Sequence, residues 1–275
     1  MRAGEGQDSP VARVESSGLS ANGHDASAAE EWRGIHITRG MRLRIGELRL
    51  SLADDGSVDA SSVEISVSID LYVHWLEIAM GHLVRAEEAH IRLLEVWELN
   101  DDAQSGVWLE GEFAASMQCI TASAVALDAF YALARHYVLV PKAEVEAWRR
   151  NRTARPRQMA EVLRRAFLIG PKSFKTVRQR LEEVSEWRDW SVHPRAGFEK
   201  PVRYDELHVG VEWRFVAFRF DNAKAILGFA LSFVAQALSR PKPYPELVEH
   251  CNGVSPLVAS LVGQWEDRYG LLYER

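Results

Sequence analysis

The sequence has little cysteine and few long apolar runs. Its two cysteines, Cys119 and Cys251, lie far apart and form no CxxC pair, so the sequence predicts neither a disulfide framework nor a zinc cluster. The most apolar stretch, 225–239, is shorter than the roughly 18 to 20 residues that cross a bilayer. The N-terminus also lacks the basic start and apolar core of a secretory signal. We therefore expect a cytoplasmic protein that does not cross a membrane.

Several common catalytic and cofactor motifs are missing as well. The sequence has no P-loop, no GxSxG elbow and no Rossmann glycine pattern. His74, His82 and His90 fall in one expected helix, but their spacing of eight does not bring them to one face as metal ligands. We therefore expect no cofactor and no bound metal.

The composition is that of a globular protein, with 47% hydrophobic and 26% charged residues. Residues 1–30 are rich in glycine, serine, alanine and acids, which predicts disorder. Apolar residues alternate over 41–45 and 63–69, on either side of Asp54-Asp55-Gly56, which predicts a β-hairpin within residues 31–69. Residues 70–240 are expected to form a helical bundle, and 241–275 a C-terminal helical extension.

Apolar residues at spacings of three and four predict most of the helices. The expected helices cover 70–99, a stretch from about Glu110 to just before Pro141, 157–168, a helix capped by Ser173, 221–238, and one or two short helices within 245–267. Alternation over 207–215 predicts a strand that could complete a small sheet with the hairpin. The expected fold is mainly α, a bundle of helices with a small antiparallel β-sheet.

Positive charge is concentrated in one segment. Residues 149–180 contain eleven basic residues and the single acid Glu161, a net charge of +10, whereas the whole chain has −6. A solvated helix face is the ordinary explanation, but so one-sided a segment also suits a surface that binds phosphates. The residues expected to bind RNA are Arg149, Arg150, Arg152, Arg155 and Arg157.

The helix capped by Ser173 has an arginine on its apolar stripe. The stripe of Val177, Leu181 and Val184 continues at position 188, which is Arg188. A guanidinium buried alone is costly, so this one must be paired, face a cleft or lie at a subunit interface. Five residues later comes His193, and the proline that follows it favours a helix end at that histidine.

The segment Arg188-Asp189-Trp190-Ser191-Val192-His193 resembles the Arg-polar-x-x-x-His motif of HEPN domains. The resemblance covers about residues 70–240, with a basic helix, the motif helix and an apolar closing helix in the family's order. It implies a helical bundle that forms a homodimer and, in many members, a metal-independent endoribonuclease whose arginine and histidine line a cleft at the dimer axis. It also implies a role in stress or defence.

Within this resemblance, the residue types suggest roles. His193 would deprotonate a ribose 2′-hydroxyl that attacks the neighbouring phosphate, and Arg188 would stabilise the charge of the transition state. Asp189 would position the arginine or the histidine across the dimer, or simply face solvent. Asp128 is a candidate partner for Arg188, in either a catalytic or a structural ion pair.

Other interpretations remain open. The same spacing of arginine and histidine also occurs at Arg85 with His90 and at Arg203 with His208, which we regard as chance matches. Some HEPN toxins have a tyrosine two residues after the histidine that a partner enzyme modifies, whereas this chain has Arg195 there, so an antitoxin of that kind is in doubt. The alternatives are an inactive HEPN-like module that binds RNA, a nucleotide or a protein, and an unrelated helical interaction protein.

Overall fold

The computed structural model describes residues 36–38, 40–46, 50–52, 58–60, 65–193 and 197–273. The chain divides into two units, residues 1–37 and 38–275. The two described residues of the first unit have no regular secondary structure, and all that follows concerns the second. The disorder expected for residues 1–30 and the turn expected at Asp54-Asp55-Gly56 lie outside the described residues.

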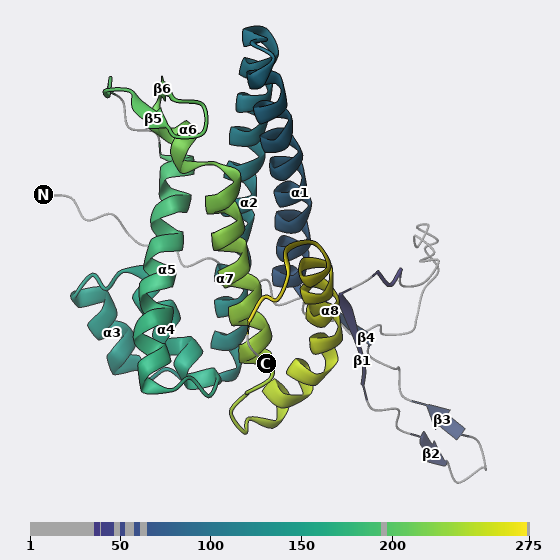
Figure 1. Cartoon of the computed structure of the whole chain (residues 1–275). Helices are drawn as coiled ribbons and strands as arrows, with labels where there is room; N and C mark the ends of the chain where they lie inside the picture. Colours follow the sequence, from purple (N-terminus) through teal and green to yellow (C-terminus); the bar gives the residue numbers. More distant parts are fainter. Residues whose placement is uncertain are drawn as a thin grey trace, which may run out of the picture. The chain divides into compact units, whose positions relative to one another are not determined.

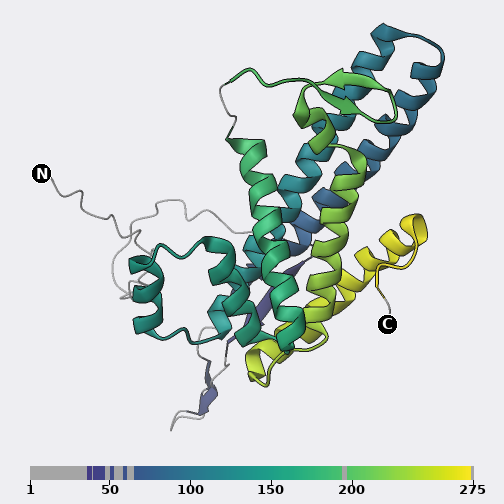
Figure 2. The same ribbon diagram turned by 60° about the vertical axis from the view of Figure 1, so that its left-hand side comes forward.

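Two long antiparallel helices form the centre of the second unit. They are α1, Leu71–Glu98, and α2, Asp102–Tyr137, which pack along each other (Figures 1 and 2). The start of α2 is fixed by Asp101, whose side chain accepts a hydrogen bond from the backbone N–H of Gln104 at 3.1 Å. The apolar pattern predicted that this helix begins near Glu110. The capped helix begins more than one turn earlier, in a stretch that starts with polar residues.

Further helices pack around α2. Contacts with it come from α4, Arg155–Ala166, from α5, Pro171–Val192, and from α7, Phe220–Leu238. The expected Ser173 cap of α5 is wrong, because Gly170 is the N-cap and Pro171 occupies the first turn. A short helix that the sequence analysis did not predict, α3, Lys142–Arg150, precedes α4.

Aromatic rings join these helices at the core. The Phe130 ring of α2 is fully buried and stacks on Phe167, at the end of α4, with ring centroids 5.1 Å apart. The same ring meets Tyr72 of α1 at 5.1 Å and the edge of Phe233 of α7 at 6.3 Å. One side chain thus ties four helices together, which is what a tightly packed interior requires.

The C-terminal part of the described chain is one helix, α8, Pro245–Tyr269, where one or two short helices were expected. It packs on α7 and α1 and buries Leu247, Val254 and Leu261 on one face. Pro256 lies inside it, so the helix continues through a residue that removes one backbone hydrogen bond.

The N-terminal hairpin is confirmed as a pair of antiparallel strands. Strand β1, Met41–Ile45, pairs with β4, Ile65–Ile69, and puts Leu43 opposite Val67. Between them, β2, Leu50–Leu52, pairs with β3, Val58–Ala60. The alternation therefore predicted the two paired strands, but most of their apolar residues are solvent-exposed, Leu43 by 42%.

The expected strand over 207–215 does not join that hairpin. Its first part is β6, Val209–Val211, which pairs with β5, Val202–Tyr204. The chain then turns into the short helix α6, Trp213–Ala217, because the Glu212 side chain accepts a hydrogen bond from the backbone N–H of Arg214 at 2.9 Å. The predicted single sheet is therefore wrong, and the described strands form three separate two-stranded sheets.

One helix of the described residues, α2, is long and apolar enough to cross a membrane by length and composition. The most apolar stretch noted in the sequence, 225–239, lies almost entirely in α7 and not in α2. In the apolar window of α2, 56% of the residues are buried within the protein. The helices α1, α4, α5 and α7 cover it, as expected for the core helix of a bundle.

Candidate functional site

Arg188 lies on the last turns of α5 and is half-buried. Its Nε and Nη2 atoms both donate to Oδ1 of Asp189, at 3.1 and 2.7 Å. Neighbouring residues of a helix do not face each other, so this pair is made at the surface by side chains that bend toward one another. Of the three alternatives for Arg188, the described structure therefore supports two, pairing and exposure to a cleft.

His193 is the C-cap of α5, as the proline after it predicted. The helix ends at Val192, the His193 backbone is non-helical, and its N–H donates to the Asp189 carbonyl oxygen at 2.9 Å. The side chain is exposed to solvent. Its ring is therefore free to contact a ligand that enters from outside.

Arg188, Asp189 and His193 line one open cleft of about 740 Å³. The opposite wall is the start of α4, with Ala154, Arg155, Pro156 and Arg157, and the rest is the α5 surface formed by Glu182, Ser185, Glu186 and Trp190. The structure gives no hydrogen bond between the described side chains of Arg188 and His193. The three predicted residues therefore line the same cleft, although Arg188 and His193 make no direct hydrogen bond to each other.

Asp128 has a different partner from the one expected. It accepts from Nε and Nη2 of Arg155 at 3.1 and 3.0 Å, and the Arg155 guanidinium also lies 4.4 Å from the Tyr131 ring centre. Asp128 is thus an ion-pair partner that fixes the start of α4 on α2. The expectation that it pairs with Arg188 is wrong.

Folding divides the basic segment into paired and unpaired charges. Arg157 pairs with Glu182, Arg180 with Glu183, and both Arg164 and Arg165 with Glu161. Hydrogen bonds from Arg164 and Arg165 lower the pKa of the Glu161 carboxyl. By contrast, no acidic partner is found among the described residues for three exposed arginines, Arg149, Arg150 and Arg152.

The unpaired arginines lie in the chain segment that directly precedes the cleft residues of α4. Arg149 and Arg150 form the last turn of α3, and Arg152 lies in the short link to α4. The first turn of α4 has no side-chain cap and presents the positive end of its helix dipole at the cleft wall. Backbone N–H groups at a helix N-terminus favour phosphate oxygens, so this side of the cleft is suited to an anion.

The aromatic residues beside the motif are mostly covered within the protomer. Trp187 meets Phe218 edge-on at 5.9 Å, and Trp190 meets Trp213 at 5.5 Å. Val192 remains 49% exposed and lines an apolar groove of about 340 Å³ with residues of α1 and α2. The groove residues are Trp75, Ile78, His82, Met117, Gln118, Thr121, Ala122, Ser191 and Val192.

The two other arginine and histidine pairs behave differently from each other. His90 lies within 3.1 Å of Glu112, and that hydrogen bond raises the pKa of the imidazole, while Arg85 contacts His82 instead. Arg203 and His208 hydrogen-bond directly at 2.7 Å across the β5–β6 hairpin, on an exposed surface. Neither pair lines the cleft that contains His193.

The sequence analysis missed a second pocket, of about 660 Å³, between the N-terminal hairpin, the end of α2 and the start of α8. Its only sequence signal is the alternation of Arg42 and Arg44 with apolar residues.

No group of three or more His, Cys, Asp or Glu side chains is placed to hold a metal ion in the described part of the chain.

Comparison with known proteins adds no assignment. No protein-family model matches the chain, and no curated protein and no solved structure matches it.

Proposed function

We propose that this chain is a metal-independent endoribonuclease of the HEPN type that acts as a homodimer. The observation that carries the proposal is that Arg188 and His193 line one open cleft together with the first turn of α4. Histidine accepts protons readily near neutral pH, and the guanidinium matches phosphate oxygens. The cleft thus combines a proton acceptor, a phosphate-binding group and a positive approach surface.

In the proposed reaction, His193 removes the proton of a ribose 2′-hydroxyl. The 2′-oxygen attacks the adjacent phosphorus, the bond to the 5′-oxygen breaks, and the products carry a 2′,3′-cyclic phosphate and a 5′-hydroxyl. Arg188 stabilises the additional negative charge on the phosphate oxygens. RNA supplies its own nucleophile in this scheme, so DNA is not a substrate.

A second copy of the chain is part of the proposal. Each cleft is open to solvent, and the exposed Val192, which lines the apolar groove, directly precedes His193 in the sequence. An isologous contact around a two-fold axis would bring two copies of this region together. Asp189, which holds Arg188 in the single protomer, would then orient it toward the shared cleft.

The alternative is a binding module without catalysis. It is favoured by the two hydrogen bonds from Arg188 to Asp189, which already engage Nε and Nη2 of the guanidinium. Such a module would bind RNA through the arginines of α3 and α4 and would not cleave it.

The deciding experiment measures cleavage of a mixed-sequence, single-stranded RNA by the purified protein in the presence of EDTA. We expect cleavage to continue, an all-deoxy substrate to resist, and the product ends to be those given above. Arg188→Ala and His193→Ala should each reduce the rate about a hundredfold or more, because each removes a group that acts in the transition state.

The matched controls are Arg203→Ala and His208→Ala, an exposed pair with the same spacing outside the cleft. They should retain the parental rate. Cleavage of DNA, loss of activity with EDTA or full activity of His193→Ala would contradict the mechanism. RNA binding without any cleavage would favour the binding module.

A further inference from the structure

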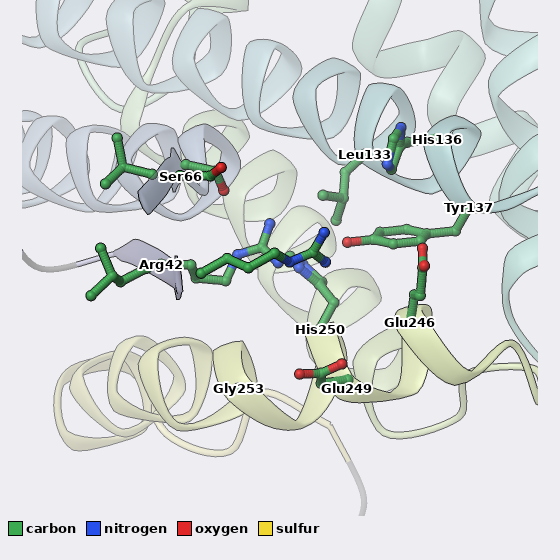
Figure 3. A pocket seen from close by; sticks show the side chains of 13 residues that line it. Arg42, Ser66, Leu133, His136, Tyr137, Glu246, Glu249, His250 and Gly253 are labelled. Carbon is green, nitrogen blue, oxygen red and sulfur yellow. The ribbon is translucent and has the colours of Figure 1, made fainter. Parts of the chain in front are cut away.

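The pocket of about 660 Å³ lies away from the cleft and draws on three parts of the chain. Strands β1 and β4 form one wall, the end of α2 contributes Leu133, His136 and Tyr137, and α8 contributes residues of its first turns (Figure 3). Pockets of this size hold small molecules in many proteins. The question is which chemistry its lining would recognise.

One lining residue, His250, lies against a group of buried polar side chains. Asp70 is buried and pairs with Nε of Arg42 at 3.2 Å, while Oδ1 of Asp70 lies 3.7 Å from Nε2 of His250. The Tyr72 hydroxyl is 3.3 Å from the same nitrogen. His250 is only 2% exposed, lines the pocket, and has no hydrogen-bond partner at Nδ1 among the described residues.

A buried imidazole nitrogen without a partner is unusual, because burial of an unsatisfied polar atom is unfavourable. Figure 3 shows the His250 ring at the middle of the pocket, between the arginine and the tyrosine. Burial and the nearby Arg42 lower the pKa of His250 to about 4. The imidazole is therefore neutral at physiological pH, and Nδ1 is a buried polar atom without a partner among the described residues, on a side chain that lines the pocket.

The walls carry opposite charges. Arg42 and Arg44 come from β1, and Arg44 has no acidic partner among the described residues. Glu246 and Glu249 come from the first two turns of α8 and have no basic partner in the described structure. Figure 3 shows Glu246 and Glu249 on the α8 side and Arg42 reaching in from the strand side.

This arrangement selects against ligands with one sign of charge. A simple anion would be attracted by the strand wall and repelled by the helix wall, and a simple cation would experience the reverse. A molecule with both charges gains from both walls. The ring of Tyr137 at the side of the pocket also suits an ammonium group, through its negative face.

We propose that this pocket binds a small zwitterion with a free ammonium group and a free carboxylate, of the class of amino acids and short peptides. Arg44 and Arg42 bind the carboxylate, and Glu246 and Glu249 bind the ammonium group beside Tyr137. The proposal is independent of ribonuclease activity, since the pocket shares no lining residue with the cleft.

The test uses trialanine and two capped analogues as probes, with binding measured by calorimetry on the full-length protein. N-acetyl-trialanine lacks the ammonium group, and trialanine amide lacks the carboxylate. Each cap should weaken binding about tenfold, because it removes one charge-assisted contact. Free alanine, measured in parallel, distinguishes a site for single amino acids from one for peptides.

Two variants assign the ends of the ligand. Arg44→Gln should weaken trialanine and N-acetyl-trialanine but leave trialanine amide unchanged. Glu249→Gln should weaken trialanine and trialanine amide but leave N-acetyl-trialanine unchanged. Both side chains are exposed, so both variants should fold, which circular dichroism checks. Arg203→Gln, an exposed arginine outside the pocket, should bind like the parent protein.

Four results would overturn the proposal. The first is binding of neither alanine nor trialanine, and the second is equal binding of trialanine and its capped analogues. The third is unchanged trialanine affinity in both Arg44→Gln and Glu249→Gln, which would mean that the peptide binds elsewhere. Tighter binding of N-acetyl-trialanine than of trialanine would identify an anion site instead.

Discussion

At the scale of single residues, Glu112 joins three parts of the chain that are far apart in sequence. The Tyr204 hydroxyl of β5 donates to its Oε2 at 2.8 Å, and the Phe220 backbone N–H at the start of α7 donates to its Oε1 at 2.8 Å. His90 of α1 lies 3.1 Å from the same Oε1. Glu112 itself is only 1% exposed. Its loss would leave several buried polar groups without a partner.

We predict that Glu112→Ala lowers the free energy of unfolding by about 3 to 5 kcal/mol, the usual cost of removing one partner from a buried charged pair. Glu112→Gln should cost less, because the amide oxygen can still accept one of the hydrogen bonds. Urea denaturation measures both. Glu110→Ala, an exposed glutamate on the same helix, is the control and should change stability by less than about 0.5 kcal/mol. A loss below about 1 kcal/mol in Glu112→Ala would contradict this role.

The cleft residues differ in whether a local sequence pattern predicts their positions. His193 could be placed from the sequence because the proline after it ends the helix, and Arg188 because helical periodicity gives its face. The partner of Asp128 could not be predicted, since it depends on how α4 approaches α2 in space. The pocket around His250 could not be predicted either, because the alternation of Arg42 and Arg44 does not reveal that α2 and α8 complete it.

At the scale of elements, α3 and the start of α4 form the arginine-rich approach to the cleft. The apolar pattern of α3 is weak and none of its residues is fully buried, which explains why the sequence analysis did not predict this helix. Its last turn nevertheless presents Arg149 and Arg150 without acidic partners in the described structure. Helix α3, rather than the whole basic segment 149–180, is therefore expected to contact RNA.

We predict that replacing Arg149, Arg150 and Arg152 with glutamine weakens RNA binding and its dependence on salt. Three lost phosphate contacts should make the slope of log affinity against log salt less negative by about 2 for single-stranded RNA. Fluorescence anisotropy at several salt concentrations measures the slope. The control replaces Arg92, Arg180 and Arg203, equally exposed arginines on other elements, and should change the slope much less. Equal slopes for the two variants would mean that only the net charge matters.

Element types were predictable where the apolar period is long and uninterrupted. The helices α1, α4, α5 and α7 and the strand pair β1–β4 follow directly from that period. The change from β6 to α6 was not predicted because apolar residues continue to alternate through Trp213 and Phe215, while the cap at Glu212 turns the backbone. The hydrogen bond of the Glu212 side chain thus determines the backbone conformation here, although five apolar residues alternate as they would in a strand.

At the scale of the whole molecule, two exposed apolar surfaces are candidates for the contact in the proposed homodimer. One is the groove beside Val192, where Ile78 is 43% exposed, and the other is the face of the N-terminal hairpin around Leu43. The proposed composite active site requires the first, because that groove includes Val192, the residue directly before His193. The hairpin face has no connection with the cleft.

We predict a dimer in sedimentation experiments and a monomer for Ile78→Glu, because a charge in the apolar groove would have to be buried in the contact. RNA cleavage should be lost together with the dimer. Leu43→Glu introduces the same charge on the hairpin and should leave both unchanged. A wild-type monomer at the highest attainable concentration, or a monomer produced by Leu43→Glu alone, would contradict a shared site at the α5 end.

The ion pair of Arg42 with Asp70, and the His250 side chain beside it, have a consequence for synthesis on the ribosome. Helices α1 and α2 are neighbours in sequence and can pair as soon as both have left the exit tunnel, since short-range contacts form early. The pocket cannot exist at that stage, because its lining needs a histidine from α8, which is translated after all the other helices. A nascent chain is therefore expected to acquire its helical centre well before it acquires the proposed ligand site, and occupancy of that site would mark only chains whose α8 has been translated and has docked.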